Sequence, residues 1–309
     1  MRVFLAGGTG AVGRRLVPQL AARGHQVTAT TTGAAGLGPL EQLGAAAVVM
    51  DGLDGASVGE AVAAARPDVV VHQMTALSAA HAGRPDLRHP DRFFALTNRL
   101  RTEGTDHLLA AAQAAGVPHV VAQSAAIWTG RDRGRLVTEE DPLQLDDLPN
   151  GGAGAAAIRY LEDTVTAAGG AVLRYGPLYG PGATDDQVEL IRKGKFPLVG
   201  GGTGCTSWLH LDDAAGATVL AVEQKARGVF NIVDDDPAPV REWLPYLARC
   251  AGARRPRRIP AWLARLVAGD MAVKLMTQSR GFSNAKAKRE LGWQPRYPSW
   301  RQGFRAELG

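Results

Sequence analysis

Short apolar runs alternate with Ala- and Leu-rich stretches of helical periodicity along the first half of the chain. The helical stretches predict helices over 10–23, 55–65, 92–115 and 153–168. The apolar runs between them predict six strands: Arg2–Ala6, His25–Thr31, Ala46–Met50, Val69–Gln73, His119–Ser124 and Ala171–Tyr175. Strands separated by helices form βαβ units, and six in succession predict an α/β fold with a doubly wound parallel sheet of the Rossmann type.

The rhythm changes after Tyr179, where Gly and Pro cluster and the alternation weakens. We expect 1–179 to form a dinucleotide-binding domain to which 207–232 returns, and 180–206 and 233–309 to form a smaller, irregular substrate-binding region. The segments 33–38 and 130–152 read as long loops rich in Gly or Asp, and one of them is a candidate lid. The apolar stretch 262–276 is either core, a dimer face or a substrate contact.

Composition narrows the class of protein. A chain of 309 residues with 45% hydrophobic residues buries a core without disulfides. The net charge of +5 is dispersed apart from the run Arg254–Arg258, so no nucleic-acid partner is expected. No apolar run is long enough for a membrane span, and the first residues do not resemble a secretory signal. Two cysteines without a CxxC spacing support no disulfide framework, so we expect the cytoplasm.

A glycine-rich loop follows the first predicted strand and opens the first helix. Gly7, Gly10 and Gly13 have the spacing at which one glycine turns the chain, one admits a pyrophosphate and one lets helix pack on strand. The amides and dipole of the helix then favour the anion. We assign cofactor binding here to Gly7, Thr9, Gly10, Ala11, Val12 and Gly13.

The end of the second strand should contact the adenosine ribose. An acid there favours NAD and an Arg favours NADP, but this chain has Thr30, Thr31 and Thr32. The cofactor is NADP or NAD, with NADP slightly favoured because no carboxylate repels a 2′-phosphate. Asp51 suits a hydrogen bond to the adenine amine, or is simply a cap or turn residue. Further cofactor contacts are assigned to Gly52, Leu53, Gln73, Met74, Thr75, Ser124 and Tyr175.

Several motifs in this order resemble one family. They are the loop 7–13, Asp51, and the segments 123–128, 173–181, 210–213 and 290–295. The chain resembles the extended short-chain dehydrogenase/reductase superfamily, specifically its NAD-dependent epimerase/dehydratase branch. The resemblance implies a catalytic hydroxyl at Ser124, four residues before Trp128, that holds a substrate carbonyl oxygen. The alternative is that Ser124 only caps the end of its strand.

The family's Tyr-x-x-x-Lys motif is missing, which makes this an atypical member. Aligned on Glu162, Gly154 and Ile158 stand at the Tyr and Lys places, and the chain has no Lys before 193. The usual general acid, and the roughly 10²- to 10⁴-fold that such an acid contributes, is therefore lost. Candidate substitutes are Tyr175, which we assign as catalytic, and Gln73, His72 and Gln123. Tyr175 as a packing aromatic and His72 as a structural residue are the alternatives.

No metal site is expected, because the family places a segment like His210, Asp212 and Asp213 at a helix start, where the acids cap the helix. The sequence predicts an NAD(P)-dependent oxidoreductase that acts on a carbonyl or hydroxyl group of a small, apolar molecule. Its Arg-rich, Lys-poor usage is typical of GC-rich bacteria and favours secondary metabolism. A homodimer is compatible with the sequence. Two alternatives stay open: a non-redox or transient-redox cyclase, isomerase, epimerase or dehydratase, and a non-catalytic dinucleotide-sensing protein.

Overall fold

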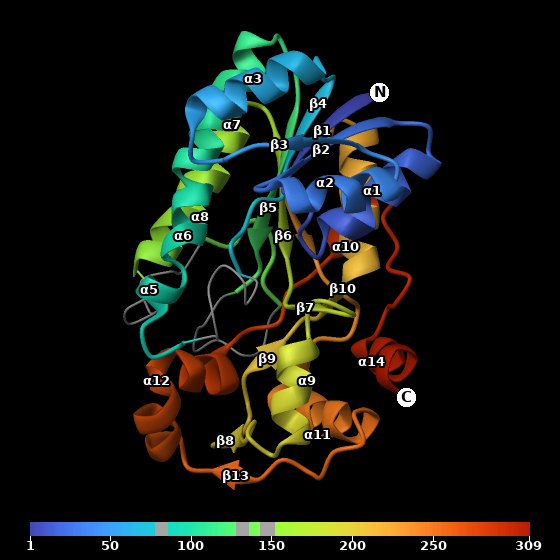
Figure 1. Cartoon of the computed structure of the whole chain (residues 1–309). Helices are drawn as coiled ribbons and strands as arrows, with labels where there is room; N and C mark the ends of the chain where they lie inside the picture. Colours follow the sequence, from blue (N-terminus) through green and yellow to red (C-terminus); the bar gives the residue numbers. More distant parts are fainter. Residues whose placement is uncertain (78–85, 128–135, 143–151) are drawn as a thin grey trace.

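The centre of the molecule is a sheet of seven parallel strands (Figure 1). The computed structural model describes residues 1–77, 86–127, 136–142 and 152–309. The strands lie in the order β11-β6-β5-β4-β1-β2-β3, so the order reverses beside β1. The doubly wound sheet predicted from the sequence is confirmed, and such a reversal is where ligands bind in this architecture. The bounds are β1 (Arg2–Ala6), β2 (Gln26–Thr31), β3 (Ala46–Val49), β4 (Val69–His72), β5 (Val120–Ala125), β6 (Ala171–Tyr175) and β11 (Gly228–Ile232).

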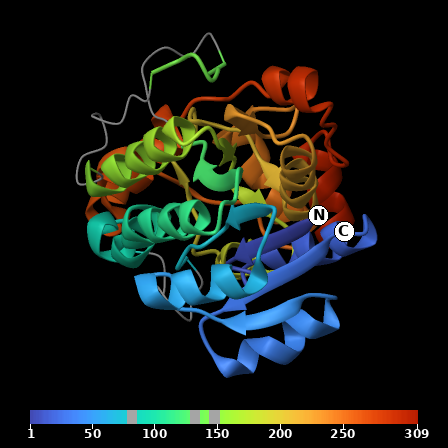
Figure 2. The same cartoon turned by 90° about the horizontal axis from the view of Figure 1, so that it is seen from above.

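Helices cover both faces of the sheet (Figures 1 and 2). Side chains alternate along a strand, so β1 contributes side chains to the core on each face of the sheet. Val3 and Leu5 pack in the core with α1 and α10, while Phe4 and Ala6 pack in the core with α3 and α7. The bounds of these helices, with α8, are α1 (Gly13–Ala22), α3 (Gly55–Ala65), α7 (Glu103–Ala114), α8 (Gly152–Ala167) and α10 (Leu211–Glu223).

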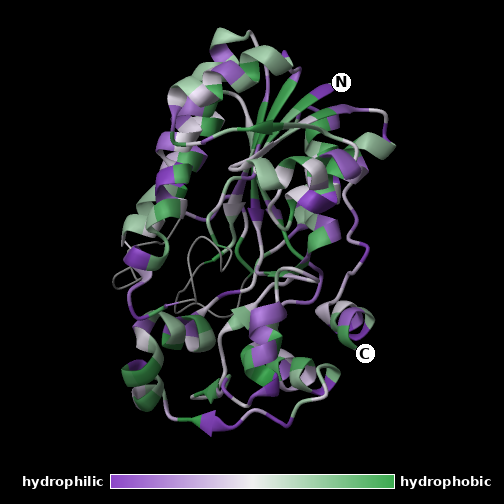
Figure 3. Ribbon diagram, viewed as in Figure 1, coloured by the Kyte–Doolittle hydropathy of each residue, from purple (hydrophilic) through white to green (hydrophobic). Residues whose placement is uncertain are grey.

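Beyond the carboxyl ends of the strands, the C-terminal part forms a second core around Trp208, Trp243 and Trp300. It also contains short strand pairs, and Figure 3 shows hydrophobic residues concentrated along the strands of the central sheet. The division into two domains stays a prediction. The bounds are β7 (Leu178–Tyr179), α9 (Asp185–Arg192), β8 (Leu198–Val199), β9 (Cys205–Thr206), β10 (Leu209–His210), β12 (Ala238–Pro239), α11 (Val240–Cys250), β13 (Arg258–Ile259), α12 (Ala261–Gln278), α13 (Ala285–Leu291) and α14 (Trp300–Leu308).

Two predicted segments differ in the structure. The expected loop 33–38 is a 3₁₀ turn, η1 (Ala34–Gly36), followed by α2 (Leu37–Gln42), because Leu40 is buried in the core beside α1. The expected helix 92–115 is instead α5 (Pro90–Phe93), α6 (Ala95–Arg101) and α7, because the backbone leaves helical geometry at Phe94 and Thr102.

The other candidate lid, 130–152, lies outside the described residues except for 136–142 and the first residue of α8, and Trp128 lies outside them too. In the described part of this segment, Val137 pairs with Phe282. None of the helices in the described part of the chain is long and apolar enough to cross a membrane.

Candidate active site

Two glycines of the loop lie where no side chain fits. Gly7 has φ +94°, and a Cβ there would lie 2.7 Å from the carbonyl oxygen of Gln73. A Cβ on Gly13 would lie 2.5 Å from the carbonyl oxygens of Gly7 and Gly8. The start of α1, the end of β1 and the end of β4 therefore meet at backbone contact.

The opening of this loop suits an anion. A Cβ on Gly10 would have only the Gly7 carbonyl oxygen nearby, at 3.3 Å, so the surface above Gly10 is open. Helix α1 begins without a side-chain cap at Val12 and without an acidic residue in its first turn. Its amides and dipole are thus available to a pyrophosphate, and the residues present fit a dinucleotide.

The three threonines at the end of β2 have different roles. Thr30 is buried, and its Oγ1 accepts a hydrogen bond from the Gly7 amide at 3.0 Å, which supports the loop from behind. Thr31 is buried too, and its Oγ1 donates to the Gly33 carbonyl at 3.1 Å. Thr32 is exposed. No acidic residue follows β2 before Glu41, so no carboxylate of this segment faces the position of a 2′-phosphate.

Asp51 forms a turn after β3. Its Oδ1 accepts a hydrogen bond from the Leu53 amide at 2.9 Å, and Asp54 caps α3. Gly52 lies against Met74, whose sulfur would be 2.4 Å from a Cβ at that position. The turn thus joins the ends of β3 and β4, where the adenine contact was predicted. That contact and the contacts of Leu53, Met74 and Thr75 with the cofactor stay predictions.

Tyr175 lies at the end of a buried hydrogen-bond relay. Gln73 Nε2 donates to the phenol oxygen at 3.0 Å, the phenol pairs with Thr218 Oγ1, and Thr218 donates to the Ala214 carbonyl at 2.8 Å. Since the hydroxyl of Thr218 donates to Ala214, the phenol proton points to Thr218, on α10. Burial raises the pKa of Tyr175 to about 12, which makes it a weaker acid. Gln73 Oε1 is buried without a partner among the described residues and is left for a ligand donor.

Ser124 belongs to a buried charged cluster on the opposite face of the sheet. Its Oγ donates to Glu162 Oε1 at 2.6 Å. Glu162 also binds Arg174 through two nitrogens, with Nη2 to Oε2 at 2.6 Å and Nε to Oε1 at 3.0 Å. Ser124, Glu162 and Arg174 are each at most 4% exposed. The hydroxyl proton of Ser124 is therefore directed at a carboxylate, while its oxygen keeps acceptor capacity.

The two positions that lack the family's proton donor lie on α8. A Cβ on Gly154 would lie 3.8 Å from Asn98 Oδ1, and that oxygen is buried without a partner among the described residues. Ile158 is buried among Ala126, Val233 and other apolar residues. Neither position supplies an acid or a cation.

His72 and His210 both serve local structure. His72 Nε2 bonds the Leu100 carbonyl at 3.2 Å, and burial lowers the pKa of His72 to about 4. His210 starts α10, where its Nδ1 accepts from the Asp212 amide, and its Nε2 contacts Glu307 at 3.0 Å.

The predicted catalytic roles of Ser124 and Tyr175 stay predictions. Sequence reasoning missed Arg101, a buried cation close to Glu162. Nothing in the sequence distinguishes it from the chain's other arginines.

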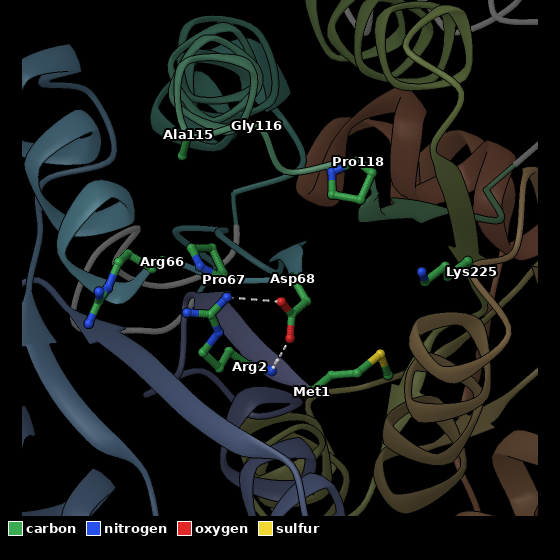
Figure 4. Close-up of a pocket in the computed structure, with 9 residues that line it drawn as sticks. All are labelled: Met1, Arg2, Arg66, Pro67, Asp68, Ala115, Gly116, Pro118 and Lys225. Carbon is green, nitrogen blue, oxygen red and sulfur yellow. Dashed lines mark hydrogen bonds and ion pairs between the residues drawn. The ribbon is translucent and has the colours of Figure 1, made fainter.

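A cavity of about 480 Å³ opens at the edge of the sheet where the parallel strands begin, opposite the edge that carries the glycine loop (Figure 4). Figure 4 shows the ion pair of Arg2 and Asp68 at its centre, between Arg66 and Lys225. Arg2 begins β1, Arg66 and Asp68 lie between α3 and β4, and Lys225 lies between α10 and β11, so all four lie at the amino ends of the strands. The cavity is thus remote from the glycine loop, and we assign the reaction to the carboxyl edge.

Comparisons with known proteins agree with this geometry. The model of the NAD dependent epimerase/dehydratase family matches residues 3–233. A 3-diazoavenalumate denitrifying reductase from a Streptomyces species is 45% identical over 99% of this chain and 100% of its own length. A 2-alkyl-3-oxoalkanoate reductase from Stenotrophomonas maltophilia is 30% identical over 82% of this chain and 77% of its own.

A solved structure shares the fold across the whole length. The UDP-glucose 4-epimerase of Thermus thermophilus, in complex with NAD, superposes with a TM-score of 0.75 at 25% identity. The superposition covers 100% of this chain and 98% of that chain.

Proposed function

The chain belongs to the NAD-dependent epimerase/dehydratase family, and on that premise we propose that it is a reductase that removes a diazo group from a small, apolar acid. As predicted, it is an NAD(P)-dependent enzyme of the oxidoreductase type that acts on a small molecule. The observation that carries the diazo assignment is the 45% identity, over essentially both entire chains, to a relative named for the denitrifying reduction of a diazo compound.

The missing proton donor agrees with this chemistry. Reduction of a carbonyl needs a hydride on carbon and a proton on oxygen, which a general acid supplies. Hydride addition to the terminal nitrogen of a diazonium group gives a neutral diazene instead. Loss of N₂ from the diazene breaks its N–H and C–N bonds and forms one C–H bond, so no external proton is consumed overall. This reaction therefore does not need the acid and the cation that Gly154 and Ile158 replace.

Each part of the site has a role in this proposal. When bound, the reduced nicotinamide supplies the hydride. The loop 7–13 holds the pyrophosphate, and the unpaired Gln73 Oε1 accepts a hydrogen bond from a ligand. The relay through Tyr175 and Thr218 fixes the orientation of the Gln73 amide. Ser124 borders the substrate and presents its oxygen as an acceptor, since its proton is held by Glu162.

We favour NADP(H) over NAD(H), because no carboxylate follows β2. We expect thermal stabilisation by NADPH to equal or exceed that by NADH, and a tenfold preference for NADH would overturn this choice (about 1.4 kcal/mol).

We place the protein in the cytoplasm; the free thiols of Cys205 and Cys250 agree with that compartment. A homodimer stays a prediction.

The test uses an aryl diazonium acid, 4-diazoniobenzoate, with NADPH. We expect one benzoate and one N₂ for each NADPH oxidised, at a rate proportional to enzyme concentration. A rate no higher than that of the reagents alone would refute the proposal.

A second candidate function is the reduction of a carbonyl group. The 30% identity to a reductase named for a 3-oxoalkanoate favours it. In that case Ser124 would have to stabilise the developing oxyanion, although its proton is directed at Glu162.

A further inference from the structure

Helix α6 ends in a buried arginine, Arg101, that has no partner in the part of the chain that the structure describes. Arg101 is 8% exposed, and its guanidinium forms no hydrogen bond or ion pair with any residue in the described ranges. Arg99, two residues earlier in the same helix, is well paired: it binds Glu103 through two hydrogen bonds of 2.8 and 2.7 Å at the surface. Arg101 therefore differs from the surface arginines, which are solvated or paired.

The acid that attracts Arg101 already has other partners. Glu162 attracts Arg101 through space. Both of its carboxylate oxygens, however, are bound at hydrogen-bond distance by Arg174, and one of them also by Ser124. His72 adds no negative charge, and the field of Arg101 helps to keep it neutral. Glu162 is thus held at hydrogen-bond distance by Arg174, and Arg101 has only its longer-range attraction.

A buried charge without a counter-ion is unfavourable, and proteins normally pair such groups. Burial lowers the pKa of Arg101 to about 10, so the guanidinium is still protonated at neutral pH. A bound anion is the simplest partner that would offset this cost.

The position of Arg101 indicates which anion. Helix α6 packs against α8, and His72, which bonds the backbone of Leu100, ends β4 directly before Gln73. The cluster with Ser124 therefore lies at the carboxyl edge, on the α8 side of the sheet. The glycine loop opens α1, which packs on the other side, so the pyrophosphate is not the partner of Arg101.

We propose that Arg101 binds an anionic oxygen of the substrate beside Ser124. The inference rests on the proposed function, because it assigns the acid group of the diazo acid to this arginine. A guanidinium fits a carboxylate through two parallel hydrogen bonds, and a phenolate oxygen offers the same chemistry with one atom.

The experiment measures binding to the enzyme saturated with NADP⁺, by calorimetry, and needs no turnover. Its probes are cinnamate, which carries only a carboxylate, methyl 4-hydroxycinnamate, which carries only a phenol, and methyl cinnamate, which carries neither. The variants are Arg101→Met and Arg101→Lys. Arg99→Met is the matched control, since it removes an exposed, paired arginine of the same helix.

We expect wild type to bind cinnamate or the phenol at least tenfold more tightly than methyl cinnamate, and the preferred probe identifies the oxygen. Arg101→Met should weaken that probe by about 10- to 100-fold, the range of charged hydrogen bonds, and leave methyl cinnamate unchanged. Arg101→Lys should restore part of the preference, and Arg99→Met should retain it. The melting temperature of Arg101→Met should stay level or rise, because an unpaired buried charge is removed.

Equal affinity of wild type for all three probes, or an unchanged preference in Arg101→Met, would overturn the inference. A fall in melting temperature with an unchanged preference would identify a structural role instead. Failure of the proposed function is separate: wild type would then bind the acids through Arg101 but release no N₂ from 4-diazoniobenzoate.

Discussion

Gly7 and Gly13 show what a sequence reveals about the individual residues of a site. Both were predicted from spacing alone, and in the structure a Cβ at either position would collide with backbone oxygen. Arg101, in contrast, is a site residue that the sequence does not reveal. Its burial depends on how α6 packs against α8, and no local pattern in the sequence encodes that contact.

Gly10 carries the first prediction. Gly10→Asp places a negative charge where the helix dipole and amides favour an anion, so we expect dinucleotide affinity to fall by at least about 100-fold with little change in melting temperature. Gly59→Asp, at an open position of α3, is the control. Calorimetric titration with NADPH measures both. Equal affinity in the two variants would contradict the placement of the pyrophosphate.

Ser124 distinguishes the two candidate reactions. Because its proton is held by Glu162 and diazo reduction consumes no proton, Ser124→Ala should lower kcat/KM for 4-diazoniobenzoate by less than about tenfold. An oxyanion donor is worth about 10²- to 10³-fold in kcat. A loss of that size, measured in initial rates, would therefore indicate carbonyl-type chemistry and a catalytic hydroxyl.

Among the helices and strands, hydrophobic alternation predicted the sheet well. The six expected strands all form. Five of them carry fully buried residues, whereas β3, at the edge of the sheet, has only the half-buried Ala47 and Val48. The helix breaks at Phe94 and Thr102 were missed, since both residues are compatible with helix and only tertiary packing sets their backbone angles. Helix α2 was missed because glycines and a proline obscure the single buried position, Leu40.

The junction of α8 with β5 and β6 depends on Glu162. Glu162→Gln leaves the guanidinium of Arg174 buried without its counter-charge, and we expect a loss of about 3–5 kcal/mol in the free energy of unfolding. Glu103→Gln removes an exposed ion pair on the same side of the sheet and should cost less than about 1 kcal/mol. Urea denaturation compares the two variants. Similar losses in both would mean that the buried pair does not stabilise this junction.

Across the molecule as a whole, Asp234 ties the C-terminal helix α14 to the sheet. It follows β11, and its Oδ2 accepts a hydrogen bond from the Trp300 amide at 2.8 Å. Burial raises the pKa of Asp234 to about 8. An acid whose pKa is raised by folding stabilises the fold while it is protonated, so this contribution is lost as the pH rises from about 4 through 8.

Asp234→Asn should therefore gain stability relative to wild type as the pH rises from about 5 to 8, and the difference should level off above that range. The amide keeps an oxygen that can accept from Trp300. Melting temperatures from about pH 5 to 9 measure the difference, and Asp235→Asn, at a half-buried ion pair with Lys288, is the control. A difference that is independent of pH would contradict the assignment.

This dinucleotide-binding frame lacks the usual proton donor, and the reduction that we propose for it needs no proton. Two acids of the same shape, 4-diazoniobenzoate and 4-acetylbenzoate, separate that reaction from carbonyl reduction when kcat/KM is measured with NADPH and the uncatalysed rate is subtracted. We predict that the diazonium acid is preferred by at least about 100-fold, the scale of a general acid's contribution, and that its kcat does not vary between about pH 6 and 8. Faster reduction of the ketone would contradict the proposal.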